Sequence, residues 1–471
     1  KVPLARPPLP LGPYTIRYRI QEHDRELAAS ESRFGVVRPS PVSYAERKRM
    51  DYPFATWAVN FHKFTARHQW EKRRLLGHYL EIAGVGKQGF VARVHPKHFL
   101  RGNEEKRRKR IQDEIDRMAD LVDTLRKYKV ETWAGFGKWP ALSEEQKSLA
   151  REITYQIING LKDKIDVWMY ADEAIHGGIK PEQIDQAKDK NGRYRLNWGY
   201  TGSAEQFLQD YMLTYRAAKR AAPNCLFGLN SASHTNGNVM RMATMVGAHK
   251  TMDLFGINMF QPSFAIWPAT VKVMKDHDVY DDIYLTSHNF PGHVDADPDA
   301  PNRIAAELDD AKQSVKYWTR TLNAFRRFAY VPQYDVGLGN GHNSMTYNER
   351  IKPVYCAYAN MTRCLGAGRF VKRHELPGAE LYVRRRSHRK GLVGVAWAES
   401  DTAVVDLDVG VDQVTISDMW GNEANLTAPD GILSCNLTDR PVYILGAKHI
   451  KPGPTVQLTI AHNTTDPDKP G

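Results

Sequence analysis

The sequence predicts an α/β protein in which a (β/α)8 TIM barrel over residues 50–368 is followed by an antiparallel β-sandwich over 369–460. From about residue 50, short apolar runs alternate with longer segments whose apolar residues recur every three to four positions. This alternation indicates parallel strands joined by helices, and eight such units make a barrel. Near residue 368 the apolar period changes to two, which is typical of antiparallel strands joined by hairpins.

The barrel strands are predicted at eight short apolar runs, and the helices at the periodic segments between them. The strands are expected at 54–60, 89–94, 130–135, 165–170, 225–230, 252–258, 283–286 and 328–334. Helices are expected at segments such as 104–128, 203–221, 301–327 and 352–367. Pro332 has no backbone N–H to donate, so it weakens the eighth strand slightly.

The two ends of the chain add short strands. The sandwich strands are expected at 380–384, 392–397, 403–409, 414–417 and 441–445, before a polar tail over 461–471. A Pro-rich start precedes two further strands at 12–20 and 33–38. Two strands form no stable domain, so they either complete the sandwich or belong to an upstream domain.

Composition limits the class of protein. With 42% hydrophobic and 10% aromatic residues, the 471-residue chain can bury a large core. No run of about 18 apolar residues occurs, so no membrane span is expected. The first residues look like a linker or a processed start rather than a signal peptide. We expect a secreted, periplasmic or cell-surface protein.

The formal net charge of +12 favours anionic partners. Basic residues cluster at 104–110 and at 384–390. The first cluster continues into an amphipathic helix and is interpreted as its solvated face. The second lies at a predicted hairpin turn and is the better candidate for contact with an anion. No nucleic-acid-binding motif accompanies either cluster, which makes nucleic acid an unlikely partner.

Neither the cysteines nor the histidines predict a metal or a cofactor. Cys225, Cys356, Cys364 and Cys435 lack metal-ligand spacing. Cys225 is expected to be a packed thiol at a strand start. Cys356 and Cys364 lie eight positions apart on one predicted helix, which is about 12 Å and too far for a disulfide. His95, His98, His288 and His293 fall near strand ends, but scattered histidines seldom form a metal site.

Glu173 is the strongest candidate for a catalytic residue. The apolar run 165–170 is followed by Asp172 and Glu173, and strand ends of this kind meet at the catalytic mouth of a barrel. Burial would raise the pKa of Glu173 and suit it to act as a general acid. The alternative is a structural carboxylate at a strand end. Asp172 is expected to point to the opposite side of the strand.

A second carboxylate is harder to place. The run 283–286 ends in Ser287 and His288 and is followed by no acid at its end. Ser287 is a poor nucleophile unless His288 serves as its base, so the alternative is that both line a polar pocket. Asp335 ends the eighth strand and is a rival second carboxylate.

Aromatic residues near the strand ends are candidates for stacking on sugar rings. They are Trp133, Phe136, Trp139, Phe260 and Trp267, with Trp139 preferred because it lies beside Pro140 in a predicted loop. The alternative for each is packing between the barrel and its helices.

Three stretches carry a resemblance to a known family. They are Val-Trp-Met-Tyr-Ala-Asp-Glu at 167–173, Met-Asp-Leu-Phe-Gly-Ile-Asn-Met-Phe at 252–260, and Lys-Pro-Val-Tyr-Cys-Ala-Tyr at 352–358 with Arg-Pro-Val-Tyr-Ile at 440–444. Over residues 50–446 the chain resembles clan A glycoside hydrolases, closest to family 39-like enzymes with a C-terminal β-sandwich. The resemblance implies that Glu173 is the acid/base.

Four departures from the family pattern fall at the site. Asp172 stands where the clan has an Asn that binds the sugar 2-hydroxyl, and Asn258 and Phe260 stand where His and Tyr are usual. Ser287 stands where the clan has its nucleophilic Glu. Together they imply a changed or lost mechanism.

Two functions are consistent with these observations. The favoured one is a glycoside-hydrolase-like protein that binds a glycan without cleaving it, or that builds an assembly with itself or with other proteins. The alternative is an active glycosidase that cleaves a β-linked glycan, including an acidic one, with Glu173 as general acid. An inverting enzyme of this kind would need a base about 6.5–9.5 Å away, for which Asp335 is the candidate.

Overall fold

A computed structural model describes residues 9–23, 25–57, 70–170, 175–176, 203–233, 246–259, 276, 283–288, 303–324, 331–334, 345–347, 350–386 and 391–454. Its largest sheet contains eight parallel strands in the order β10-β9-β8-β6-β5-β4-β3-β11, with the short β7 (Ile175–His176) beside β8. The strands are β3 (Phe54–Trp57), β4 (Lys87–Val94), β5 (Glu131–Phe136), β6 (Val167–Tyr170), β8 (Leu226–Ser233), β9 (Leu254–Met259), β10 (Ile283–His288) and β11 (Val331–Tyr334). All eight predicted strands are confirmed as members of one parallel sheet.

The strand order follows the chain except at one point. β11, the last parallel strand, pairs with β3, the first, so that Val331 lies opposite Phe54 and Tyr334 opposite Trp57. The two ends of the path, β10 and β11, also approach each other. The hydrogen-bonded path itself runs through eight strands from β10 to β11.

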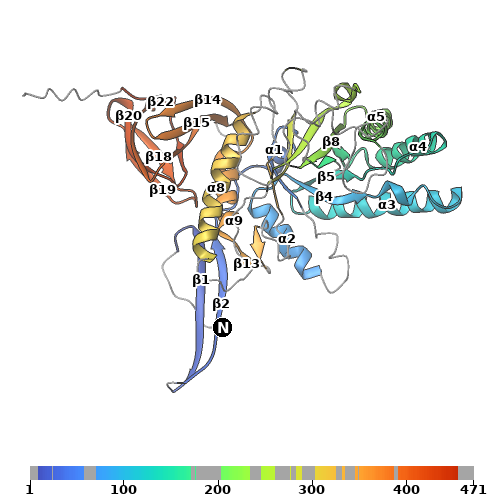
Figure 1. The fold of residues 1–471 in the computed structure, drawn as a ribbon. Helices are drawn as coiled ribbons and strands as arrows, with labels where there is room; N and C mark the ends of the chain where they lie inside the picture. Colours follow the sequence, from blue (N-terminus) through green and yellow to red (C-terminus); the bar gives the residue numbers. More distant parts are fainter. Residues whose placement is uncertain are drawn as a thin grey trace, which may run out of the picture.

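Helices cover one face of this sheet (Figure 1). Apolar side chains fill the other face. The helices include α2 (Trp70–Ile82), α3 (Glu104–Arg126), α4 (Glu144–Leu161), α5 (Ala204–Ala221), α8 (Arg303–Ala324) and α9 (Pro353–Leu365). Trp168 and Tyr170 belong to the large core shared with the helices, whereas Val167 and Met169 belong to a smaller cluster with Trp133. Because successive strand residues point to opposite faces, the smaller cluster lies on the face away from the helices.

Side-chain caps explain where several helices begin. The side chain of Asn103 accepts a hydrogen bond from the backbone N–H of Lys106 at the start of α3, and Ser203 does the same at α5. Ser143 and Gln146 form a reciprocal capping box at α4. Such caps satisfy N–H groups that have no partner within the helix.

Lys87 is a buried cation at the start of β4. Its ammonium group donates to the carbonyl of Arg49 over 2.7 Å, and burial lowers its pKa from the usual 10.5 to about 8. Between these two values the unfolded chain binds a proton that the folded chain has released. The free energy of unfolding should therefore rise with pH across this window, by on the order of 3 kcal/mol.

Lys87→Met tests this expectation. The difference in unfolding free energy between wild type and variant should change between pH 8 and pH 10.5 and stay constant below pH 7, as measured by urea unfolding. A difference that is the same at every pH would show that Lys87 keeps its ordinary pKa in the fold.

The C-terminal part contains two antiparallel sheets. The larger has the order β14 (Gly368–Leu376), β15 (Ala379–Arg386), β16 (Leu392–Ala398), β21 (Val442–Leu445), β18 (Gln413–Ser417) and β19 (Glu423–Thr427). The smaller contains β20 (Ile432–Thr438), β17 (Thr402–Asp408) and β22 (Lys451–Pro452). Both sheets contribute to one apolar cluster, with Leu381 and Ile444 from the larger and Leu407 and Leu433 from the smaller. The five predicted strands of this region are confirmed as antiparallel.

The N-terminal strands form a ribbon of their own. β1 (Gly12–Glu22) pairs with β2 (Arg25–Val36) in a separate antiparallel two-stranded sheet that projects from the body (Figure 1). It therefore joins neither C-terminal sheet. At its root, Arg33 forms a 2.7 Å ion pair with the buried Glu307 of α8.

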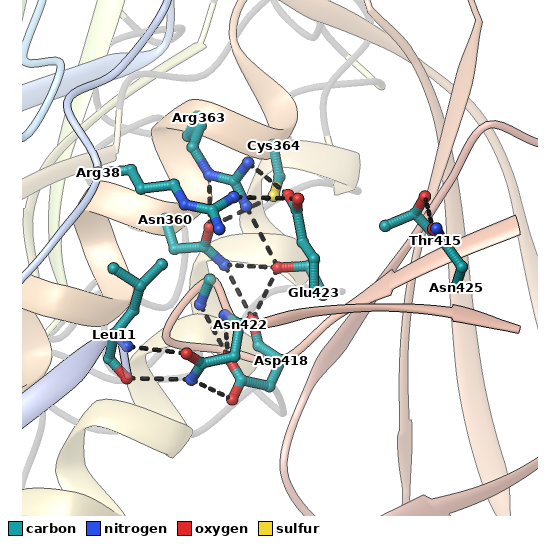
Figure 2. Close-up of polar contacts among 12 residues, drawn as sticks. Leu11, Arg38, Asn360, Arg363, Cys364, Thr415, Asp418, Asn422, Glu423 and Asn425 are labelled. Carbon is teal, nitrogen blue, oxygen red and sulfur yellow. Dashed lines mark hydrogen bonds and ion pairs between the residues drawn. The ribbon is translucent and has the colours of Figure 1, made fainter. Parts of the chain in front are cut away.

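A polar junction joins α9 to the turn between β18 and β19 and to the N-terminal segment (Figure 2). Arg363 of α9 donates to Glu423 over 2.6 Å and to Asn360 over 2.9 Å. Asn422 accepts from the backbone N–H of Leu11 over 2.8 Å and donates back to its carbonyl over 3.0 Å. Asp418 accepts from the backbone N–H groups of the same turn. These contacts fix the position of the C-terminal sheets against the helical layer.

The second basic run begins inside the fold. Arg384 is buried, donates to the carbonyls of Leu322 and Gly368, and has its pKa lowered by burial to about 10. It therefore ties β15 to α8 and is not available to an external anion. Among the residues that the structure describes, no helix is both long and apolar enough to cross a membrane.

Candidate functional site

The C-terminal ends of the parallel strands lie at one edge of the sheet, which we term the C-terminal edge. The register places three polar residues in a row across neighbouring strands at this edge. Ser233 of β8 lies opposite Asn258 of β9, and Asn258 lies opposite Ser287 of β10. His288 follows, opposite Met259. The backbone thus brings Asn258, Ser287 and His288 together.

The remaining polar candidates follow strands that end at the same edge. β6 ends at Tyr170, three residues before Glu173, and β11 ends at Tyr334, directly before Asp335. Asp172, Glu173, Phe260, Trp267 and Asp335 themselves lie outside the described residues, as does His293. Their roles stay predictions.

Trp133 fills the face of the sheet that points away from the helices. It is buried and belongs to the small cluster with Ala55, Met169 and Leu254. Gly89 on the neighbouring strand makes room for it, since a Cβ atom at Gly89 would lie 1.7 Å from Cε2 of the indole. For Trp133, the described structure therefore shows core packing.

Trp139 is also buried, between the sheet and α5. Its indole N–H donates to the hydroxyl of Thr214 over 3.0 Å, and its backbone N–H donates to the hydroxyl of Tyr170 over 3.2 Å. Its ring lies 6.0 Å from that of Phe136. No part of the indole is exposed, so in this structure the packing alternative describes Trp139. The sequence does not predict Thr214 as the partner of Trp139, because α5 begins more than 60 positions after Trp139.

We predict that Trp139→Phe lowers the free energy of unfolding by about 1–3 kcal/mol, because it shrinks a packed side chain and removes the donor to Thr214. Glycan affinity should stay unchanged. Thermal unfolding and a binding titration on the same samples check both expectations. A variant of normal stability with reduced glycan affinity would instead make Trp139 a sugar platform.

Of the histidines near this edge, the structure describes the side chains of His95 and His98. The rings of His95 and His98 lie 5.8 Å apart, on the segment that follows β4. Within the described ranges, no group of three or more His, Cys, Asp or Glu side chains could hold a metal ion. Cys225, Cys356, Cys364 and Cys435 are all free thiols.

Solved structures share this architecture over most of the chain. A family 39 glycoside hydrolase from Bacteroides cellulosilyticus WH2 superposes with a TM-score of 0.63 at 15% identity, covering 92% of this chain and 88% of that one. The chain has a glycoside hydrolase fold. SrfJ from Salmonella typhimurium gives a TM-score of 0.55 at 8% identity, covering 93% of this chain and 100% of that one.

A third structure, BuGH86E322Q in complex with neoagarooctaose, gives a TM-score of 0.54 at 11% identity, covering 86% of this chain and 75% of that one. No protein-family model and no curated protein matches the chain. At these identities the likeness concerns the glycoside hydrolase fold alone. It confirms the clan A-like resemblance at the level of structure.

Proposed function

We propose that the chain binds a glycan at the C-terminal edge of its parallel sheet and does not cleave it by a retaining mechanism. The observation that carries this proposal is the row formed by Ser233, Asn258 and Ser287. All three residues are neutral, and Ser287 stands on the strand where a retaining enzyme of this clan carries its nucleophile.

Retaining hydrolysis needs two carboxyl groups about 5–5.5 Å apart, one as general acid and one as nucleophile. Glu173 can supply the general acid, but Ser287 cannot supply the carboxylate nucleophile that the retaining mechanism needs. Neutral hydroxyl and amide groups at adjacent strand ends are instead suited to hydrogen bonding with sugar hydroxyls.

We also propose that the parallel sheet is a closed barrel and that the two C-terminal sheets form a β-sandwich. The pairing of β11 with β3, together with the approach of β10 to β11, supports a sheet closed into a (β/α)8 barrel with the site at its mouth. The apolar cluster shared by the two C-terminal sheets supports a β-sandwich. A role outside the cytoplasm fits a glycan ligand.

The second candidate is an inverting glycosidase. Asp335 directly follows β11 in the sequence, and β11 ends at the same edge as β6, which precedes Glu173. An inverting pair stands about 6.5–9.5 Å apart with a water between. In this alternative Glu173 is the acid and Asp335 the base.

A glycan array followed by product analysis tests both candidates. Wild type should bind at least one oligosaccharide and should release no product with retained anomeric configuration, as followed by NMR. Glu173→Gln should keep binding, and Glu105→Gln on the exposed start of α3 serves as the matched control. Turnover with retention that Glu173→Gln abolishes would refute the proposal. Turnover with inversion that Asp335→Asn abolishes would establish the second candidate.

A further inference from the structure

A groove of about 480 Å³ lies between α3 and the segment that follows β4. His98, Phe99 and Arg101 form one wall. Arg110, Asp113, Glu114 and Arg117 of α3 form the other. The residues on α3 are spaced three and four apart, so they share one face of the helix. Phe99 is buried beneath the charged side chains.

The groove is on the same side of the sheet as the candidate site. β4 ends at Val94 and is followed by the 3-10 turn η3 (Pro96–His98), so this wall begins at the C-terminal edge. The backbone N–H of Gly137, directly after β5, donates to the carbonyl of Val94 over 2.8 Å. The groove therefore begins near the ends of β4 and β5, at the same edge of the sheet as the proposed glycan site.

The backbone holds Arg110 in place. Its guanidinium donates to the carbonyl of His98 over 3.2 Å and to that of Arg101 over 3.0 Å. The first turns of α3 carry no buried side chain before Ile111, so this part of the helix contacts the body mainly through such bonds. A guanidinium fixed in this way loses less conformational entropy when it binds a ligand.

The charges in the groove leave a positive excess. Asp113 pairs with Lys109 over 2.8 Å, and Glu114 pairs with Arg117 over 2.6 Å. Among the described residues, the guanidinium groups of Arg101 and Arg110 have no carboxylate partner. Both side chains are exposed. Guanidinium groups bind carboxylate and sulfate groups through paired hydrogen bonds.

We propose that this groove binds the carboxylate or sulfate group of an acidic glycan whose chain extends from the C-terminal edge. The inference rests on the proposed function and adds the class of ligand to it. Arg101 and Arg110 contact the anionic group. The run 104–110 is thus more than a solvated helix face, because its last residue lines the groove.

Binding titrations can test this with the full chain. The probes are tetrasaccharides of oligogalacturonate and chondroitin sulfate, each beside its neutral counterpart (carboxyl-reduced or desulfated). Wild type should bind an acidic probe at least roughly tenfold more tightly than its counterpart, and the preference should fall as salt rises. In the double variant R101Q/R110Q the preference should disappear, with affinity for the neutral probe unchanged.

Two further variants make the result specific. R108Q removes the same charge from α3, but Arg108 pairs with Glu104 outside the groove, so its affinities should match wild type. R101Q changes only an exposed side chain and should reduce the preference roughly threefold or more even if the double variant is unstable.

Equal wild-type affinity for acidic and neutral probes would overturn the inference and leave the proposed function intact. If no probe binds, both fail. A single-stranded DNA of equal charge that binds as tightly, and that loses affinity in the same variants, would also overturn it, since the groove would then be a general polyanion surface.

Discussion

Gly89→Ala should lower the free energy of unfolding by more than about 3 kcal/mol, because the new methyl group would collide with Trp133 inside the sheet. The Cβ atom would lie 1.7 Å from Cε2 and 1.8 Å from Cζ2 of the indole. Trp133 is itself enclosed by Met169 and Leu254, so the ring has little room to move. Urea unfolding, followed by circular dichroism, measures the loss.

Two companion variants show whether the collision is the cause. Trp133→Leu should make Gly89→Ala much less damaging, so the double variant should be more stable than the sum of the single changes predicts. Gly160→Ala on α4 is the control, because its nearest neighbour is the flexible end of Ile115 at 2.7 Å and helical alanine is favoured by about 1 kcal/mol. If the losses of stability in the two single variants simply add in the double variant, contact with Trp133 is not the cause of the loss in Gly89→Ala.

Arg363→Met should lower the free energy of unfolding by about 1–3 kcal/mol, since it removes the buried partner of a half-buried ion pair together with its hydrogen bonds. Arg363 is largely buried and donates to Glu423 of β19 over 2.6 Å and to Ser417 of β18 over 3.3 Å. The variant removes this donor from the junction between α9 and the C-terminal sheets, where Glu423 keeps Arg38 as its remaining partner. We also expect the two parts to unfold in separate steps, which calorimetry would resolve.

Arg38→Met is the matched control, because Arg38 pairs with the other oxygen of the same carboxylate over 3.0 Å. Its side chain is 50% exposed, so its loss should cost less than about 1 kcal/mol. Equal losses for the two arginines would mean that burial does not set the strength of this junction.

The sequence pattern was informative for the parallel strands, although it missed β20 (Ile432–Thr438), in which Leu433 and Leu437 are buried. The parallel strands are enclosed by helices and by the inner cluster, so their apolar runs stand out. β14 and β19 were missed because most of their residues are exposed, which leaves no alternation to detect. Residues 25–32 belong to strand β2 because they pair with β1. Their Ala, Glu and Ser residues do not favour a strand by themselves.

The candidate site was predictable only in part. Strand periodicity predicts where a strand ends, and this was enough to place Asn258 beside Ser287. Stacking on sugars and packing in a core use the same aromatic residues, so the sequence could not separate them for Trp139. The helical spacing of Arg110, Glu114 and Arg117 predicts that they share one wall of the groove. The other wall comes from the segment after β4, whose position depends on the tertiary fold.

The polar junction also affects how the chain can fold as it is synthesised. Leu11 forms a hydrogen bond with Asn422, which lies 411 positions later in the sequence. In the same way, β3 pairs with β11, which is synthesised much later than β3. At about 5–20 residues per second, a ribosome needs on the order of 20–80 s to cover that distance. During this time the ribbon β1–β2 is present without the partners of its root. Chaperones that bind the nascent chain should therefore increase the yield of folded protein more than those that act after release.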